Sequence, residues 1–132
     1  MLTVRVAAHV HSNWSYDAAW TLPALAKALS RCRYDVVLMA EHDPGFTQSR
    51  WEDYRRACAN ASDEQQLLVP EIEYEDPENV VHTPVWGVPF LGSGRQTREI
   101  LTAAGDSGAV AILAHRGGET PGLASTRRWY LR

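Results

Sequence analysis

Two kinds of hydrophobic pattern alternate along the chain. Short apolar runs typical of buried strands are separated by segments in which apolar residues recur every three or four positions, as on one face of a helix. The runs predict strands over residues 3–8, 35–40, 67–69, 80–90 and 109–114, of which the run 80–90 is interrupted by Pro84 and Gly87. The periodic segments predict helices over residues 22–33, from Thr47 or Ser49 to about Ala59, and from Thr97 to Gly105 or Gly108. This alternation implies right-handed βαβ units and a parallel sheet, either open or curled into a barrel.

Histidines mark the ends of the predicted strands. All five follow an apolar run: His9, His11, His42, His82 and His115. Because functional groups in α/β folds gather at the carboxyl ends of parallel strands, we expect these rings to converge. His9 and His11 are two residues apart, so on an extended segment both rings point to one face and can chelate a metal. A single histidine at a strand end is more often a polar cap or a hydrogen-bonded core residue, but five in such positions favour a metal site.

Carboxylates accompany these histidines. Asp17 follows the first pair, and Glu41 directly precedes His42. Glu71 and Glu73 both follow the predicted strand 67–69, and Glu73 is the better candidate ligand of the two. Imidazole and carboxylate together suit zinc, manganese or iron, whereas calcium and magnesium favour an all-oxygen shell. We therefore expect a divalent transition metal.

Two further segments contain candidate phosphate ligands. The backbone N–H groups of Gly92-Ser93-Gly94-Arg95 could cradle a phosphate, but a short glycine loop without the full nucleotide-binding pattern is usually a turn. Arg116 stands next to His115 and could hold a phosphate oxygen through two hydrogen bonds. A surface arginine after a strand is an equal alternative for Arg116.

Composition narrows the class of protein. A chain of 132 residues predicts a single domain, 1–132, and no apolar stretch approaches the roughly 18 residues of a membrane span. The amino terminus does not resemble a signal peptide, so we expect a cytoplasmic protein with no membrane partner. A formal charge of −3 disfavours bulk nucleic-acid binding. Cys32 and Cys58 lack metal-type spacing and are expected to be reduced thiols.

Five ordered segments resemble the successive metal-binding motifs of the polymerase and histidinol phosphatase (PHP) family. They are AHVHSNWSYD, VVLMAEHD, LLVPEIEY, VVHTPVWGV and VAILAHRGG, and the resemblance extends from residue 3 to about residue 118. The resemblance implies an α/β fold of a particular kind, a distorted (βα)7 barrel. It also implies up to three metal ions at the carboxyl ends of the barrel strands.

Carried over residue by residue, the resemblance assigns the ligands of each ion. His9 and His11 would bind a first metal, and Glu73 would bridge it to a second. The remaining ligands are His82 and His115 for the second metal, and Asp17 and His42 for the third.

The chain departs from the family pattern in two places. Glu41 stands where the family usually has Asp, which could alter how His42 is oriented, since neighbouring carboxylates fix ligand geometry. The family's closing Asp-x-His motif is also missing after His115. We therefore expect an incomplete barrel, corresponding to the amino-terminal half to two-thirds of a PHP domain.

The leading functional hypothesis is a metal-dependent phosphoesterase. It would hydrolyse a small phosphoester or nucleotide through a hydroxide bridging two metals, with Glu73 as the metal bridge and Arg116 as a phosphate contact. One alternative is a non-catalytic metal-binding or scaffold module, or a truncated and inactive fragment. A less favoured alternative is an amidohydrolase-like enzyme, which also begins with His-x-His. Many amidohydrolases bridge their metals with a carbamylated lysine at a strand end, whereas Lys27 lies within a predicted helix.

Overall fold

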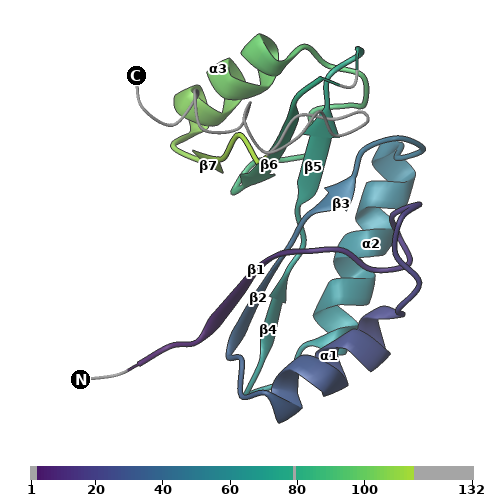
Figure 1. The fold of residues 1–132 in the computed structure, drawn as a ribbon, viewed down its shortest axis with the longest axis vertical. Helices are drawn as coiled ribbons and strands as arrows, with labels where there is room; N and C mark the ends of the chain where they lie inside the picture. Colours follow the sequence, from purple (N-terminus) through teal and green to yellow (C-terminus); the bar gives the residue numbers. More distant parts are fainter. Residues whose placement is uncertain (1–2, 79, 115–132) are drawn as a thin grey trace, which may run out of the picture.

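The computed structural model describes residues 3–78 and 80–114, which form a mixed α/β fold with two sheets and three helices (Figure 1). The first sheet contains β1 (Val6–Val10), β2 (Val36–Met39) and β4 (Leu67–Val69). The second contains β3 (Glu41–His42), β5 (Ile72–Glu75), β6 (His82–Trp86) and β7 (Val110–Ala111). The helices are α1 (Leu22–Arg31), α2 (Gln48–Ala61) and α3 (Thr97–Ser107).

The helices begin and end close to the predicted positions because local capping signals are present. Thr47 caps α2, where its hydroxyl oxygen accepts a hydrogen bond of 3.2 Å from the Arg50 backbone N–H. Gly108 ends α3 with a φ of 65°, a left-handed conformation that glycine adopts at little cost. Helix α1 ends at Arg31, earlier than the predicted residue 33, and Arg33 itself has a φ of 61°.

The first sheet is parallel, as predicted, with β2 between β1 and β4. Helices α1 and α2 lie on the same side of this sheet (Figure 1), where Val37 and Met39 are fully buried. On the opposite face Val6 is 47% exposed and Leu67 is 52% exposed. The apolar run 35–40 was expected to be a buried strand, but only the residues of β2 that face the helices are fully buried, because both helices cover one face.

The second sheet departs from the predicted all-parallel arrangement. Strand β3 is parallel to β5, but β5 and β6 are antiparallel, and so are β6 and β7. Residues 76–81 connect β5 to β6, which is too short for the crossover of about a dozen residues that parallel strands require. Pro84 lies inside β6, and its carbonyl accepts a hydrogen bond of 3.0 Å from the Ile112 N–H.

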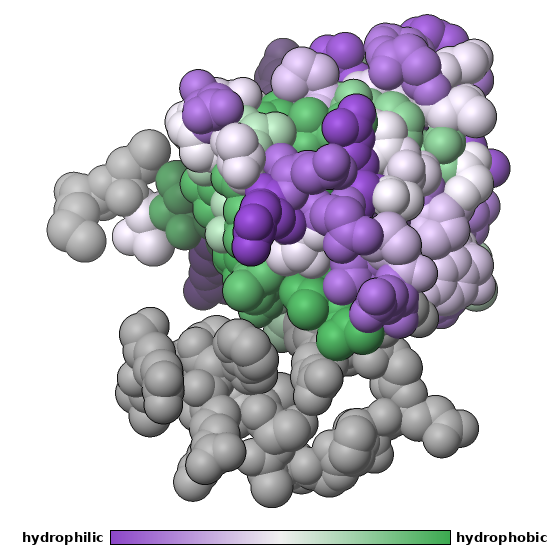
Figure 2. Space-filling model, turned by 90° about the horizontal axis from the view of Figure 1, so that it is seen from above, coloured by the Kyte–Doolittle hydropathy of each residue, from purple (hydrophilic) through white to green (hydrophobic). Residues whose placement is uncertain are grey.

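The last strand is shorter and more exposed than the sequence predicts. Only Val110–Ala111 form β7, and the exposed fractions of Val110, Ile112 and Leu113 are 58%, 46% and 44%. Figure 2 shows hydrophobic residues reaching the surface along one border of the face seen from above. The expected buried strand 109–114 is thus wrong, since nothing among residues 3–78 and 80–114 packs over the outer side of β7.

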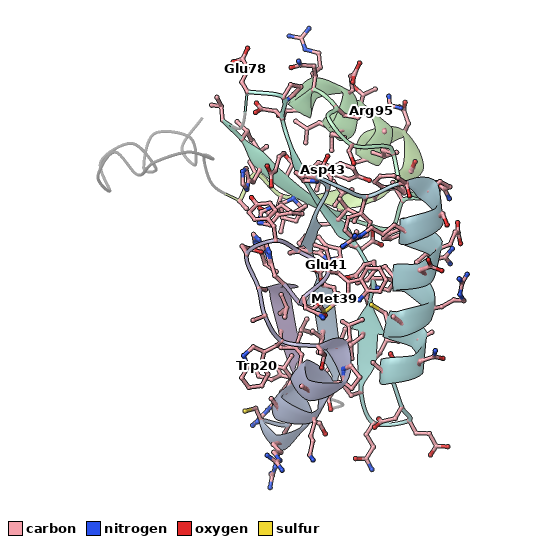
Figure 3. All side chains as sticks on the ribbon, turned by 90° about the vertical axis from the view of Figure 1, so that its right-hand side faces the viewer. Trp20, Met39, Glu41, Asp43, Glu78 and Arg95 are labelled. Atoms are coloured by element: carbon pink, nitrogen blue, oxygen red, sulfur yellow. The ribbon has the colours of Figure 1, made fainter. Side chains whose placement is uncertain are left out.

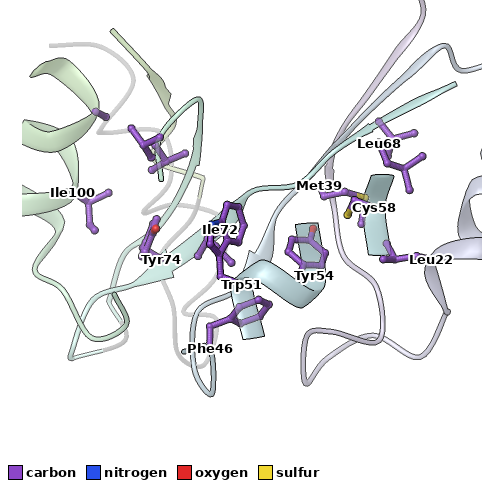
Figure 4. Close-up of a cluster of buried hydrophobic side chains, with 14 of the residues drawn as sticks. Leu22, Met39, Phe46, Trp51, Tyr54, Cys58, Leu68, Ile72, Tyr74 and Ile100 are labelled. Carbon is purple, nitrogen blue, oxygen red and sulfur yellow. The ribbon is translucent and has the colours of Figure 1, made fainter. Parts of the chain in front are cut away.

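One hydrophobic core extends beneath both sheets (Figure 4). Its members come from all three helices and from strands of each sheet, and they include Leu22, Met39, Tyr54, Leu68, Ile72 and Ile100. The indole N–H of Trp86 in β6 donates to the Met39 carbonyl at 2.9 Å and ties the second sheet to the first. The described residues form no closed barrel, and none of their helices has the length and apolar character to cross a membrane.

Candidate metal centre

A bulge in β1 positions His9, which lies in the strand, beside His11, which follows the strand directly. The pairing of β1 with β2 shifts between Ala8 and Val10, and His9 has a φ of 60°, which is uncommon for a residue other than glycine. The rings of His9 and His11 are stacked, with centroids 5.0 Å apart and planes at 15°. The predicted pairing of the two rings is therefore present, but a bulged backbone at the end of the strand produces it.

Glu73 is the carboxylate on which the histidines converge. Its Oε2 lies 2.9 Å from His9 Nε2 and 3.2 Å from His11 Nε2, while its Oε1 lies 3.5 Å from His82 Nδ1. The side chain is fully buried in β5. Burial alone would raise the pKa of Glu73, but hydrogen bonds from His11, His82 and His9 hold this pKa well below its usual range. The structure thus brings together Glu73 and three of its four predicted histidine neighbours.

A second group forms around Asp17. Its two carboxylate oxygens lie 3.3 Å from His11 Nδ1 and 3.4 Å from His42 Nε2. The Asp17 side chain is 42% exposed, whereas that of His42 is only 5% exposed. The predicted association of Asp17 with His42 is present, and His11 joins both this group and the one around Glu73.

A third group contains a carboxylate that the sequence analysis missed. His42 Nδ1 lies 2.8 Å from Glu75 Oε1, and Glu75 stands opposite His82 in the antiparallel pairing of β5 with β6. The three side chains offer ligand atoms that all lie within 4.8 Å of one another. A signal for Glu75 was available, because Glu73 and Glu75 are two residues apart and a strand places such residues on one face.

These seven side chains make up the ligand cluster: His9, His11, Asp17, His42, Glu73, Glu75 and His82. Within it, the Glu73 hydrogen bond is the main cause that raises the pKa of His82. Burial would lower the pKa of His11, but Glu73 and Asp17 together raise it. Burial lowers the pKa of His42. The cluster therefore contains imidazoles that hold a proton strongly beside one that holds it weakly.

Beneath the ligand cluster lies a supporting layer formed by Ser12, Ser15, Glu41 and Asp43. Glu41 is fully buried and accepts hydrogen bonds from the backbone N–H of Ser12 at 2.9 Å and from the Ser15 hydroxyl at 2.6 Å. The Ser15 hydroxyl in turn accepts a hydrogen bond of 2.9 Å from the His42 backbone N–H. Glu41 thus reaches His42 through Ser15.

Asp43 organises the other side of the supporting layer. Its carboxylate accepts hydrogen bonds from the backbone N–H groups of Glu75 at 2.8 Å and Gly94 at 2.9 Å. Figure 3 shows Met39, Glu41 and Asp43 following one another from the first sheet toward the second. Because the Gly94 N–H donates to Asp43 and the Arg95 side chain donates to the Leu91 carbonyl, the loop 92–95 fits the turn interpretation better than a phosphate cradle.

Three other residues from the sequence analysis lie outside the ligand cluster or outside the described structure. Glu71 turns away and accepts a hydrogen bond of 2.8 Å from the Gly87 N–H, and burial raises its pKa to about 7. His115 and Arg116 are not among the described residues, so their predicted roles remain predictions.

The sequence matches no model of a known protein family and none of the curated proteins with which it was compared. The resemblance to the PHP family therefore depends on the motifs quoted above.

Proposed function

We propose that this chain is a metal-dependent phosphoesterase of the PHP type, acting on a small phosphate ester or nucleotide. The observation that carries the proposal is the position of Glu73. One fully buried carboxylate lies within 3.5 Å of ring nitrogens from β1, the segment after it, and β6. Fully buried carboxylates are rare unless they are paired, and a carboxylate together with imidazoles is a common donor set for zinc, manganese and iron.

The donor atoms fit a metal ion in spacing as well as in type. Two ligands bound to zinc at about 2.1 Å in tetrahedral geometry lie about 3.4 Å apart. The Glu73 oxygens lie 2.9, 3.2 and 3.5 Å from the nitrogens of His9, His11 and His82. In addition, the buried His42 Nδ1 has no hydrogen-bond partner among the residues that the structure describes. An uncompensated ring nitrogen of this kind suits a metal ligand.

Each part of the ligand cluster then has a chemical task. A divalent ion held there would supply Lewis acidity, which would polarise a phosphoryl oxygen and make water acidic enough to attack near neutral pH. Glu73 would contribute the charge that offsets bound cations, and it joins His9 of β1 and His11 after it to His82. Asp17, whose side chain is 42% exposed, lies on the solvent side, where a substrate would enter.

The test compares wild type with Glu73→Gln, which keeps the size of the side chain and removes its charge. After loading with zinc or manganese and removal of free ion, we expect bound metal in the wild type and its loss in the variant, measured by inductively coupled plasma mass spectrometry. Glu64→Gln is the matched control, because Glu64 is exposed in the connection between α2 and β4.

Activity is measured on p-nitrophenyl phosphate and on a nucleoside monophosphate. The proposal predicts metal-dependent phosphate release that Glu73→Gln abolishes and Glu64→Gln retains. Metal uptake without phosphate release would favour the non-catalytic metal-binding module instead. Absence of metal from the wild type would refute both.

A further inference from the structure

We propose that Glu75 is a metal ligand and that it forms, with His42 and His82, a second metal site next to the one centred on Glu73, with His82 at the boundary between the two. Neither the sequence motifs nor the family resemblance assigns Glu75 a role. The inference rests on the proposed function only in requiring the same class of divalent transition metal.

The backbone places the three side chains together. Glu75 is the cross-strand partner of His82 in the pairing of β5 with β6, and His42 is the partner of Glu73 in the pairing of β3 with β5. Directly opposed residues on neighbouring antiparallel strands have Cβ atoms about 5 Å apart, close enough for their side chains to share an ion. Asp43 fixes this register further, since it accepts the Glu75 backbone N–H at 2.8 Å.

The contact between His42 and Glu75 is short but is not a hydrogen bond. His42 Nδ1 and Glu75 Oε1 are 2.8 Å apart, yet the ring nitrogen makes no hydrogen bond with any described residue. The His42 residue is only 4% exposed, so water does not readily compensate it. A short approach of two potential ligand atoms without a hydrogen bond between them supports an ion shared by both.

The other ring nitrogen of His42 is left for Asp17. His42 Nε2 lies 3.4 Å from Asp17 Oδ2, on the opposite side of the ring from Glu75. If Nδ1 bound an ion, Nε2 would carry the ring proton and would donate a hydrogen bond to Asp17, as metal-bound histidines commonly do toward a neighbouring carboxylate. Asp17 therefore acts as a positioning residue for this site.

Tyr16 closes the site toward solvent. Its hydroxyl donates a hydrogen bond of 2.8 Å to Glu75 Oε1, and its ring stacks on His42 with centroids 4.8 Å apart. Tyr16 itself is 67% exposed. The phenol thus holds the Glu75 carboxylate against His42 Nδ1 without contributing a ligand of its own, which makes Tyr16 a second positioning residue.

The test is equilibrium dialysis of the metal-free protein against buffered Zn²⁺, with bound metal counted by mass spectrometry and folding checked by near-ultraviolet circular dichroism. We expect Glu75→Gln to bind one equivalent less than the wild type, and Glu64→Gln to bind the wild-type number. Tyr16→Phe should keep the number and weaken the last equivalent roughly tenfold, as loss of a group that orients a ligand does.

A spectroscopic measurement distinguishes loss of a ligand from a general disturbance. The visible absorption of the Co²⁺-loaded protein should lose one component in Glu75→Gln and keep the rest. If Glu75→Gln binds Zn²⁺ with the wild-type number and affinity, this inference is wrong and the proposed function stands. If the wild type binds no metal, the proposed function fails as well.

Discussion

The ligand cluster and the supporting layer beneath it both contain buried carboxylates, but different chemical groups surround these carboxylates in the two regions. Glu73 and Glu41 are each fully buried. Imidazoles surround Glu73, whereas Glu41 accepts hydrogen bonds from a backbone N–H group and from serine hydroxyls. An imidazole can exchange its proton for a metal ion, and a backbone N–H group cannot.

The pKa shifts follow the same division. Burial raises the pKa of Glu41 and of Asp43, despite the hydrogen bonds that both accept. Burial acts on Glu73 as well, but the histidine hydrogen bonds outweigh it and the pKa falls. The comparison indicates that the supporting layer holds the chain in place, while the ligand cluster keeps a charge available for a cation.

The largest expected effect on stability is that of Glu41→Ala. The substitution leaves the Ser12 N–H and the Ser15 hydroxyl buried without their acceptor, so the free energy of unfolding should fall by about 3 kcal/mol. Urea denaturation measures this loss, and we expect a similar value with and without saturating zinc. If the folded variant instead loses its metal and keeps its stability, the two regions are not distinct.

A smaller effect comes from Glu71, a buried carboxylate that belongs to neither region and accepts a hydrogen bond from the Gly87 N–H. Because burial raises its pKa from 4.5 to about 7, the folded protein binds one more proton than the unfolded chain between these values. This contribution to stability is fully present below about pH 4.5 and is lost as the pH rises through 7.

Glu71→Gln keeps an acceptor for Gly87 and removes the titration. Between pH 5 and pH 8 the stability of the metal-free wild type should fall by roughly 2 kcal/mol more than that of Glu71→Gln. Urea unfolding at several pH values measures the difference between the two proteins. Parallel pH profiles for wild type and variant would show that Glu71 does not titrate in this range.

The smallest effect concerns the backbone of the ligand cluster. His9 has a φ of 60°, which glycine adopts more readily than any residue with a Cβ atom. In the metal-free protein, His9→Gly should therefore be about 1 kcal/mol more stable than His9→Ala, the reverse of the order within a regular strand. Thermal unfolding of the two variants compares them directly, and a more stable alanine variant would contradict the bulge.

Local signals in the sequence predicted much of the first half of the fold. The strand at 67–69 has the predicted bounds, and the hydroxyl of Thr47 begins α2 as one of its two candidate caps. Parallel pairing of β1, β2 and β4 follows from their separation by helices. These features depend on periodicity and capping, which short segments encode by themselves.

The second sheet was harder to predict because strand direction depends on how the connections run in space. An apolar run such as 109–114 indicates burial, but it does not identify the surface that would cover it, and the described structure leaves Val110 exposed. Six of the seven side chains that form the ligand cluster were predicted as candidate ligands; Glu75 was not, because its position in the acidic run 71–78 resembled a solvated loop. Glu75 lies in the ligand cluster because it pairs with His82 on the neighbouring antiparallel strand. The periodicity of β5 alone does not show which residue lies opposite Glu75.

X-ray absorption of the zinc-loaded protein tests the central claim, that a metal ion binds among the histidines around Glu73, most directly. We predict a shell of nitrogen and oxygen ligands at about 2.0–2.2 Å with the outer scattering typical of imidazole, and no sulfur at about 2.3 Å. Sulfur scattering, which would implicate Cys32 or Cys58, or a shell without imidazole, would contradict the account.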